Sequence, residues 1–409
     1  MVYVLDYTGK AIMPTERHGN VRRLLRDGKA HVVRLEPFTI QLDYESKGYT
    51  QEVSLGVDAG SVHIGLSATT KKKELFAAEV ILRTDIVELL STRREQRHTR
   101  RARKTRYRAV RFNNRRKKES WLAPSVRNKI DTHLRVIRMI NSILPIANTT
   151  IEVAQFDIQK IKNEKIRGVE YQDGEQMGFW NVREYVLARD DHKCQHCKGK
   201  SGDNILNVHH LESRKTGGNA PNNLITLCET CHKSYHRGEF ELKVKRGTSF
   251  RDASFMNIMR WMVYEKTKCV FKNVFITFGY KTKHVRIKNN IEKTHIADAR
   301  CISGNPKAKP MCFYYFCRRV RRHNRQIHKV NIKKGGMRKL NQAPYKMFGF
   351  RLFDKVKCEE KECFVFARRK SGKFDIRTID GVRLYASKSY KKLKFLEERK
   401  SLIMTRIYD

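Results

Sequence analysis

Cysteine and histidine side chains cluster between residues 194 and 236 with the spacing of metal ligands. Two Cys-x-x-Cys pairs are present, formed by Cys194 with Cys197 and by Cys228 with Cys231. This spacing is typical of a tetrahedral four-cysteine zinc site, which is closed and stabilises a small module instead of reacting. The sequence therefore predicts a structural Zn2+ ion at these four thiols.

Four histidines that follow the first cysteine pair need a different explanation. His209 and His210 end the strand-like run ILNVHH, so their side chains diverge. His232 and His236 are four residues apart and share one face of a predicted helix. One strand histidine can then ligate a cation while the other removes a proton from water, as phosphodiester hydrolysis requires. The alternative is a set of surface histidines on a zinc finger that only binds DNA.

Three carboxylates lie in otherwise apolar predicted elements. Asp58 in LGVDAG and Glu152 in TIEVAQFD lie on strands, and Asp298 in HIADAR lies on a helix one turn after His295. Acidic residues are rare in such places. Mg2+ prefers oxygen ligands, and two ions about 4 Å apart stabilise both the attacking and the leaving oxygen of a phosphodiester. The alternative for each carboxylate is an ordinary charge at the end of an element.

The charge of the chain indicates a polyanionic partner. Its 87 Lys and Arg against 42 Asp and Glu give a net charge of +45, for which nucleic acid is the first candidate. Residues 93–118 hold 14 basic residues and one acidic residue, without Pro or Gly. A helix of that length spans about 39 Å at about 1.5 Å per residue and would cross many phosphates. The alternative is a solvated charge run.

A membrane surface is the second candidate partner, and the sequence argues against it. The chain has no apolar run of roughly 18 residues, and MVYVLDYTGK lacks the pattern of a signal peptide. We therefore expect a cytoplasmic, nucleoid-associated protein. Ten cysteines without a signal favour metal ligands and buried thiols over disulfides.

The apolar patterning predicts an α/β multidomain protein. Hydrophobic residues make up 40% of the chain, enough for several packed cores. Residues 1–52 read as a small α/β unit, and VSLGVDAGSVHIGLSAT, from residue 53, as a hairpin. The remaining predicted elements are helices at 126–146, 254–268 and 291–304, strands at 149–157 and 273–286, and small β-hairpins from 303 onward.

The Cys/His region resembles a known family of nucleases. The order Cys-x-x-Cys, His-His, Gly-Gly, Asn-Leu and Cys-x-x-Cys-His is similar to the HNH endonucleases of the ββα-metal fold. That resemblance implies His210 as general base and one Mg2+ ion held by His209 and His232, with His236 as a further ligand. It also implies Asn223 as the residue that orients the loop, with Asn222 as the alternative.

The whole chain resembles the IscB family of compact, transposon-encoded, RNA-guided nucleases. The motif V-D-x-G-S with its hairpin, then the arginine-rich helix, I-E on a strand and H-x-x-D-A on a helix, is similar to a split RNase H-like (RuvC) domain with an HNH module inserted. The N-terminal unit resembles the family's PLMP domain, although its motif reads AIMP at residues 11–14. The resemblance implies that Asp58, Glu152 and Asp298 bind two Mg2+ ions, with His295 as ligand or base.

The resemblance also implies boundaries and partners. The expected domains are PLMP 1–52, RuvC segments 53–90, 121–172 and 249–305, bridge helix 91–120, HNH 173–248, and a β-rich domain 306–409 that contacts guide RNA and a target-adjacent motif. The bridge helix would bind nucleic acid through Arg93, Arg94, Arg97, Arg100, Arg101, Arg103, Lys104, Arg106, Arg108 and Arg111.

The expected assembly is a monomer with a structured guide RNA, acting on double-stranded DNA. The HNH site would cut the guide-paired strand, and the RuvC site would cut the displaced strand. The alternatives are an unguided structure-selective or homing endonuclease, a regulator that binds RNA or DNA without cutting and, with least support, a transposase.

Overall fold

The computed structural model describes residues 1–102, 121–153, 182–212, 223–242, 251–321 and 344–408. The chain forms two compact units. The first comprises 1–113, 123–155 and 256–409, and the second 114–122 and 156–255. The fold is mixed α/β and multidomain, as predicted, and each unit is considered by itself.

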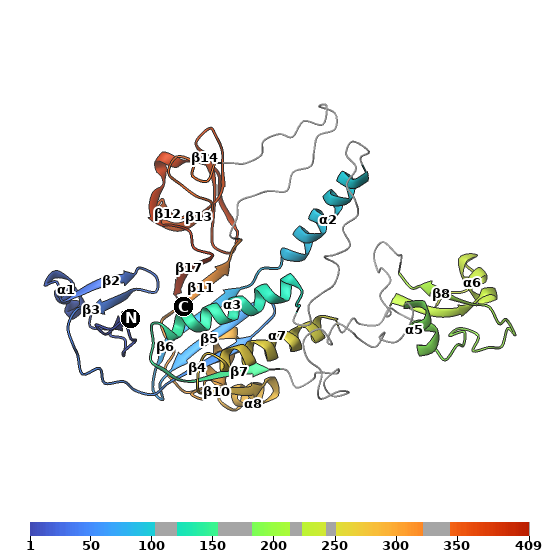
Figure 1. The fold of residues 1–409 in the computed structure, drawn as a ribbon, viewed down its shortest axis with the longest axis horizontal. Helices are drawn as coiled ribbons and strands as arrows, with labels where there is room; N and C mark the ends of the chain where they lie inside the picture. The colour runs from blue at the N-terminus through green and yellow to red at the C-terminus, as the bar shows by residue number, and fades with distance from the viewer. Residues whose placement is uncertain (103–120, 154–181, 213–222, 243–250, 322–343, 409) are drawn as a thin grey trace. The chain divides into compact units, whose positions relative to one another are not determined.

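A seven-stranded sheet is the centre of the first unit (Figure 1). Its order is β10-β7-β4-β5-β6-β11-β17. The strands β4, β5 and β6 form an antiparallel meander. The strand β7 runs parallel to β4, β10 runs parallel to β7, and β11 runs parallel to β6. The strand bounds are β4 Val53–Ala59, β5 His63–Thr69, β6 Glu74–Ile81, β7 Ile146–Val153, β10 Val274–Phe278, β11 Phe313–Arg319 and β17 Leu402–Tyr408.

The predicted hairpin from residue 53 is confirmed as β4 and β5. Almost every residue of β4, β5 and β6 is buried, which is typical of strands covered on both faces. The helices of this unit are α2 Ile86–Ala102, α3 Pro124–Asn141, α8 Gly279–Lys288 and α9 His295–Ile302, together with α7 Arg251–Lys268 from residue 256 onward.

The strand predicted at 273–286 is wrong in its second half. The strand β10 ends at Phe278, and α8 begins at Gly279. The least exposed residues of α8 are Thr282, Val285 and Arg286, which is helical spacing. Residues three and four apart therefore face the rest of the unit, whereas a strand would alternate.

The helix α9 lies directly on β4 and β5 because two glycines leave room for it. A Cβ atom on Gly56 would lie 1.9 Å from the carbonyl oxygen of Ala299, and one on Gly65 would lie 2.0 Å from that of His295. The helix begins at a defined residue, since the Thr294 side chain accepts a hydrogen bond of 3.0 Å from the backbone N–H of Ala297. The start of α9 is thus fixed against the middle of the sheet.

Two smaller sheets belong to the first unit. The N-terminal sheet has the order β1-β3-β2, from β1 Tyr3–Leu5, β2 Ala30–Arg34 and β3 Thr39–Leu42, with α1 at His18–Arg26. The C-terminal sheet has the order β15-β14-β13-β12-β16, from β12 Lys355–Cys358, β13 Lys361–Arg368, β14 Lys373–Arg377, β15 Arg383–Ser389 and β16 Lys394–Glu397. Since β11 and β17 belong to the large sheet, the strands of the separate C-terminal sheet cover only residues 355–397 of the predicted range 306–409.

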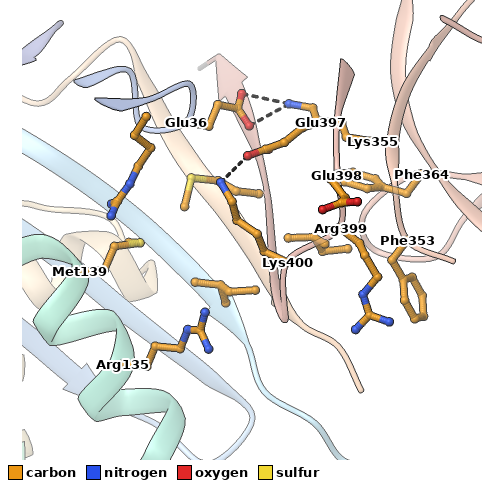
Figure 2. Close-up of a pocket in the computed structure, with 14 residues that line it drawn as sticks. Glu36, Arg135, Met139, Phe353, Lys355, Phe364, Glu397, Glu398, Arg399 and Lys400 are labelled. Carbon is orange, nitrogen blue, oxygen red and sulfur yellow. Dashed lines mark hydrogen bonds and ion pairs between the residues drawn. The ribbon is translucent and has the colours of Figure 1, made fainter. Parts of the chain in front are cut away.

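One ion pair connects the segment after β2 with the C-terminal sheet within the first unit. The ammonium of Lys355, whose side chain is 6% exposed, lies 2.8 Å from Glu36 and 2.7 Å from Glu362. Figure 2 shows the Glu36 pair at the edge of a pocket of about 430 Å³, beside a second pair between Lys400 and Glu397. A buried ammonium needs such partners, because its unpaired charge would cost several kcal/mol.

The second unit contains a two-stranded sheet between two helices. The antiparallel strands are β8 Leu206–His210 and β9 Leu224–Cys228, and the helices are α5 Val182–Arg189 and α6 Glu229–His236. Its small core includes the cysteines themselves, packed with Ile225 and Leu227. Among the described residues of both units, no helix combines the length and apolar character needed to cross a bilayer.

We predict that Gly56→Ala or Gly65→Ala lowers the free energy of unfolding of the first unit by about 3 kcal/mol or more, because backbone atoms of α9 occupy the space of the new methyl group. Gly19→Ala is the matched control, since Gly19 lies in α1 with nothing within 4 Å of its Cβ position. Thermal unfolding measures both changes. Equal stability of all three variants would contradict the close approach.

His133 predicts an acid sensitivity. It is fully buried in α3, and burial lowers the pKa of its imidazole to about 4. Between about pH 6.5 and pH 4, His133 is therefore protonated in the unfolded chain and neutral in the folded chain. The stabilisation is complete above pH 6.5 and falls by about 1.4 kcal/mol per pH unit toward pH 4.

We expect His133→Phe to reduce this loss, seen as a shallower fall of the melting temperature between pH 7 and pH 5. The exposed His284 provides the control, because His284→Phe should keep the wild-type slope. An unchanged slope in His133→Phe would show that other groups cause the acid sensitivity.

Candidate functional sites

The four predicted zinc ligands come together in the second unit. One sulfur atom from each of Cys194, Cys197, Cys228 and Cys231 lies within 4.8 Å of the others. The first pair lies on a tight turn after α5, in which the N–H of Lys198 donates to the carbonyl of Cys194 at 2.9 Å. The second pair spans the junction of β9 and α6. This cluster could hold zinc, and its thiols supply the core of an otherwise small module.

Three histidines form a second cluster in the same unit. Nitrogen atoms of His209, His232 and His236 lie within 4.8 Å of one another. The strand β8 supplies His209, and successive turns of α6 supply the other two. Burial, followed by the charges of His232, His236 and His210, lowers the pKa of His209 to about 4, so its imidazole is neutral near pH 7. Neutral imidazole is the form that ligates metal.

This histidine cluster fits a bound cation. The Nε2 atom of His209 is buried and has no hydrogen-bond partner among the described residues, which is costly unless another group binds it. Imidazole donors favour transition ions such as Zn2+, whereas Mg2+ prefers oxygen ligands. The chemistry of these residues therefore supports a divalent cation without selecting Mg2+.

The other two HNH-type residues lie next to this cluster. His210 follows His209 on β8 and is partly exposed, and alternation along the strand turns it to the other face. Asn223 is fully buried, and its side chain accepts from the N–H of Glu212 at 2.9 Å and donates to its carbonyl at 3.1 Å. Asn223 therefore ties together the two chain segments at the loop end of the β8–β9 hairpin. Asn222, the alternative, lies outside the described residues.

The predicted carboxylates of the first unit come from two adjacent strands of the large sheet and from the helix that packs on it. Asp58 is the penultimate residue of β4, Glu152 lies on the adjacent strand β7, and Asp298 lies in the first turn of α9. His295, also on α9, shares a hydrogen bond of 2.7 Å between its Nδ1 and Oδ2 of Asp58. That bond raises the pKa of His295 above its usual value.

The electrostatics of these carboxylates favour cations. Burial and then the charge of Asp58 raise the pKa of both Glu152 and Asp298, so the three negative charges interact. Arginines offset part of this charge, with Arg260 3.5 Å from Glu152 and Arg286 3.0 Å from Asp298. Oxygen donors at these positions fit hard cations such as Mg2+.

The first turn of α8 also faces this group of carboxylates. A Cβ atom on Gly279 would lie 3.5 Å from Oε1 of Glu152, so the helix N-terminus lies against the carboxylate. A helix N-terminus carries partial positive charge and stabilises a nearby anion.

The sequence interpretation missed several side chains around the carboxylates. His63 and Glu79 lie beside His295, and ligand atoms of these three residues lie within 4.8 Å of one another. Glu79 sits in the apolar run ELFAAEVI, which is the same signal that identified Asp58. Arg260 and Arg286 carried no local signal, because each meets its carboxylate only through the fold.

Only the beginning of the predicted bridge helix is described. The described part of α2 runs to Ala102, and Arg93, Arg94 and Arg97 on it are exposed. The backbone of Arg100 and Arg101 is helical. The remaining predicted contacts, Arg103, Lys104, Arg106, Arg108 and Arg111, lie outside the described residues.

Comparisons with known proteins agree with this division into regions. A family model described as RRXRR protein matches residues 2–174, and one described as HNH endonuclease matches residues 194–238. The HNH match contains both the four-cysteine cluster and the histidine cluster. The chain thus contains an HNH endonuclease domain preceded by an RRXRR region. This organisation is IscB-like, which confirms the resemblance noted in the sequence.

Individual relatives match over shorter stretches. Anaredoxin of Nostoc sp. (strain PCC 7120) is 44% identical over 41 residues, which are 10% of this chain and 54% of that protein. The chain thus spans about half the length of this curated relative. Two crystal structures of Streptococcus thermophilus Cas9, in complex with the AGAA and the GGAA PAM, match 62% of this chain and 32% of theirs at 13% identity. The TM-score of both matches is 0.30.

We predict that Cys228→Ala removes the zinc ion and unfolds the module around β8, β9 and α6, because the thiols hold its small core together. Zinc content per chain and hydrogen exchange across residues 182–242 measure the effect. Cys312→Ala is the control, since Cys312 is exposed and outside the cluster. Wild-type zinc content and exchange protection in Cys228→Ala would exclude the structural role.

Proposed function

We propose that the protein is an RNA-guided double-stranded DNA endonuclease with two separate nuclease sites. The main supporting observation is that one chain contains two different groups of side chains, each suited to phosphodiester hydrolysis. One is the histidine cluster of the HNH domain, and the other is the group formed by Asp58, Glu152, Asp298 and His295. Two sites of different chemistry suit the two strands of a duplex.

The HNH domain would cut the guide-paired strand. A cation held by His209, His232 and His236 would supply a Lewis acid for the phosphodiester. His210, on the opposite face of β8, would accept a proton from the attacking water, and Asn223 would keep the end of the hairpin in shape. The four cysteines would hold the structural zinc.

The carboxylate group would cut the displaced strand, as a split RuvC-type domain. The structure supports this assignment because three pieces distant in sequence share one sheet: the 53–81 meander, β7, and β10 with α9. Two Mg2+ ions bound by Asp58, Glu152 and Asp298 would stabilise the charge that develops on the phosphodiester. His295, polarised by Asp58, would accept or hold a proton at this site.

The basic character of the chain would serve a guide RNA and its DNA target. Exposed Arg93, Arg94 and Arg97 start a basic segment that the RRXRR match includes. Such a protein reads the shape of a heteroduplex and leaves sequence to base pairing. We further propose the N-terminal unit as a PLMP domain, residues 306–409 as the region for the guide and the target-adjacent motif, and a monomeric complex with RNA.

We predict that His210→Ala slows cutting of the guide-paired strand by about 10² to 10⁴-fold, the usual contribution of a general base. Asp58→Ala should abolish cutting of the displaced strand, and neither change should weaken RNA binding. Strand-specific end labels on a matched duplex in Mg2+ give both rates in one reaction. His192→Ala is the control, because His192 is exposed and outside the histidine cluster.

If either single substitution stopped both cuts, the assignment of one strand to each site would be wrong. The guided mechanism is tested separately by purifying the protein with its native flanking locus and sequencing any bound nucleic acid. One abundant structured RNA with a variable end supports guidance. Mg2+-dependent cutting of naked or branched DNA without a discrete RNA would instead support the unguided endonuclease.

A further inference from the structure

A row of three residues crosses β4, β5 and β6 under the start of α9. The register pairs Asp58 with Gly65 and Gly65 with Glu79. Cross-strand partners point to the same face of a sheet, so two carboxylates flank a glycine. The backbone of His295 occupies the space above that glycine, since a Cβ atom on Gly65 would meet its carbonyl oxygen at 2.0 Å. His295 is therefore placed between the two carboxylates.

A second histidine completes this arrangement. His63 lies on β5 two residues before Gly65 and therefore on the same face. Its Nδ1 lies 2.6 Å from Oε1 of Glu79, and its ring is stacked on that of His295, with centroids 5.2 Å apart and an interplanar angle of 3°. Each imidazole is thus held by its own carboxylate at Nδ1, and the two rings are parallel.

His295 needs this support because burial does not hold it. It is the first residue of α9, and its side chain is 44% exposed. The bond to Asp58 restrains one ring nitrogen but leaves the ring able to tilt about that bond. A parallel ring against one face restricts the tilt, and positional errors of about 1 Å at a reacting group can cost about 10²-fold in rate.

Two simpler interpretations of His63 and Glu79 explain less. A surface ion pair would not require the His63 ring to lie parallel to that of His295. A cation held by His63, Glu79 and His295 would have to use the Nε2 atoms of the histidines, since both Nδ1 atoms lie at hydrogen-bond distance from carboxylates, and it would not require the two rings to be parallel.

We propose that His63, anchored by Glu79, is a positioning residue that fixes the ring plane of His295 at the carboxylate site. The inference rests on the proposed function, in which this site cuts the displaced strand. Its effect is therefore confined to one strand, and the HNH cut of the same duplex serves as an internal reference.

The experiment compares His63→Ala, His63→Phe and Glu79→Gln with the wild type, using the full chain with its RNA and a matched duplex at saturating concentration. We expect His63→Ala to lower the displaced-strand rate by about 10 to 100-fold without changing the guide-paired strand. His63→Phe keeps a flat ring, and Glu79→Gln keeps an acceptor for Nδ1, so both should stay within about threefold of the wild type. His31→Ala is the matched control, because His31 forms a similar pair with Asp43 at 2.8 Å in the N-terminal sheet.

A crystal structure of His63→Ala gives a readout that does not depend on cutting. We expect the His295 ring to leave its plane or to occupy more than one orientation, while α9 stays in place. An unchanged His295 ring would overturn the inference, as would a displaced-strand rate within twofold of the wild type, or a loss in His63→Phe as large as in His63→Ala. If the wild type leaves the displaced strand intact, the proposed function fails, and the crystal structure still decides whether His63 positions His295.

Discussion

The close approach of α9 to the large sheet is the constraint on which the carboxylate site depends. Gly56 and Gly65 have no side chain, and backbone atoms of α9 lie where their Cβ atoms would be. A helix raised by even one methyl group would carry Asp298 and His295 away from Asp58. The hydroxyls of Ser303 and Thr69, 2.8 Å apart and buried, connect the end of the same helix to β5. Both ends of α9 are therefore fixed to the meander.

The two candidate sites are held by different physical means. The carboxylate site lies on a seven-stranded sheet, whose buried area can carry the cost of clustered negative charges. The second unit has a core that includes its own cysteines, so a metal at the thiols would supply much of its folding free energy. Loss of that metal would then affect the histidine cluster while leaving the sheet intact, which separates the two sites energetically.

Local patterns in the sequence were sufficient for some of this architecture. Two β-rich runs joined by a tight turn predict the β4–β5 hairpin, and the spacing of the four cysteines predicts their cluster. These features depend on residues near one another in the chain. Asp58 was identifiable because an acidic residue in an apolar strand has no local explanation.

Features that depend on long-range pairing were not predictable in this way. The parallel pairing of β11 with β6 brings residues 313–319 into the large sheet, and no nearby residue signals it. The contact between His63 and Glu79 requires the register of β5 against β6, since the two are diagonal neighbours. The pairing of Arg286 with Asp298 depends on how α8 and α9 pack. In each case the partner is decided by the fold and not by the neighbouring sequence.

The charge of the chain connects its stability to its partners. A net charge of +45 remains after the 42 Asp and Glu are counted against the 87 Lys and Arg, and this excess of positive charge repels itself in the folded state. Some acidic residues pair at packed positions, as Glu36 does with Lys355 and Asp298 with Arg286, while Arg93, Arg94 and Arg97 on α2 are exposed to solvent. A polyanion that binds the folded chain relieves this repulsion and stabilises it by mass action. For the proposed nucleic-acid partner, added salt would weaken binding and therefore also the stabilisation that binding provides.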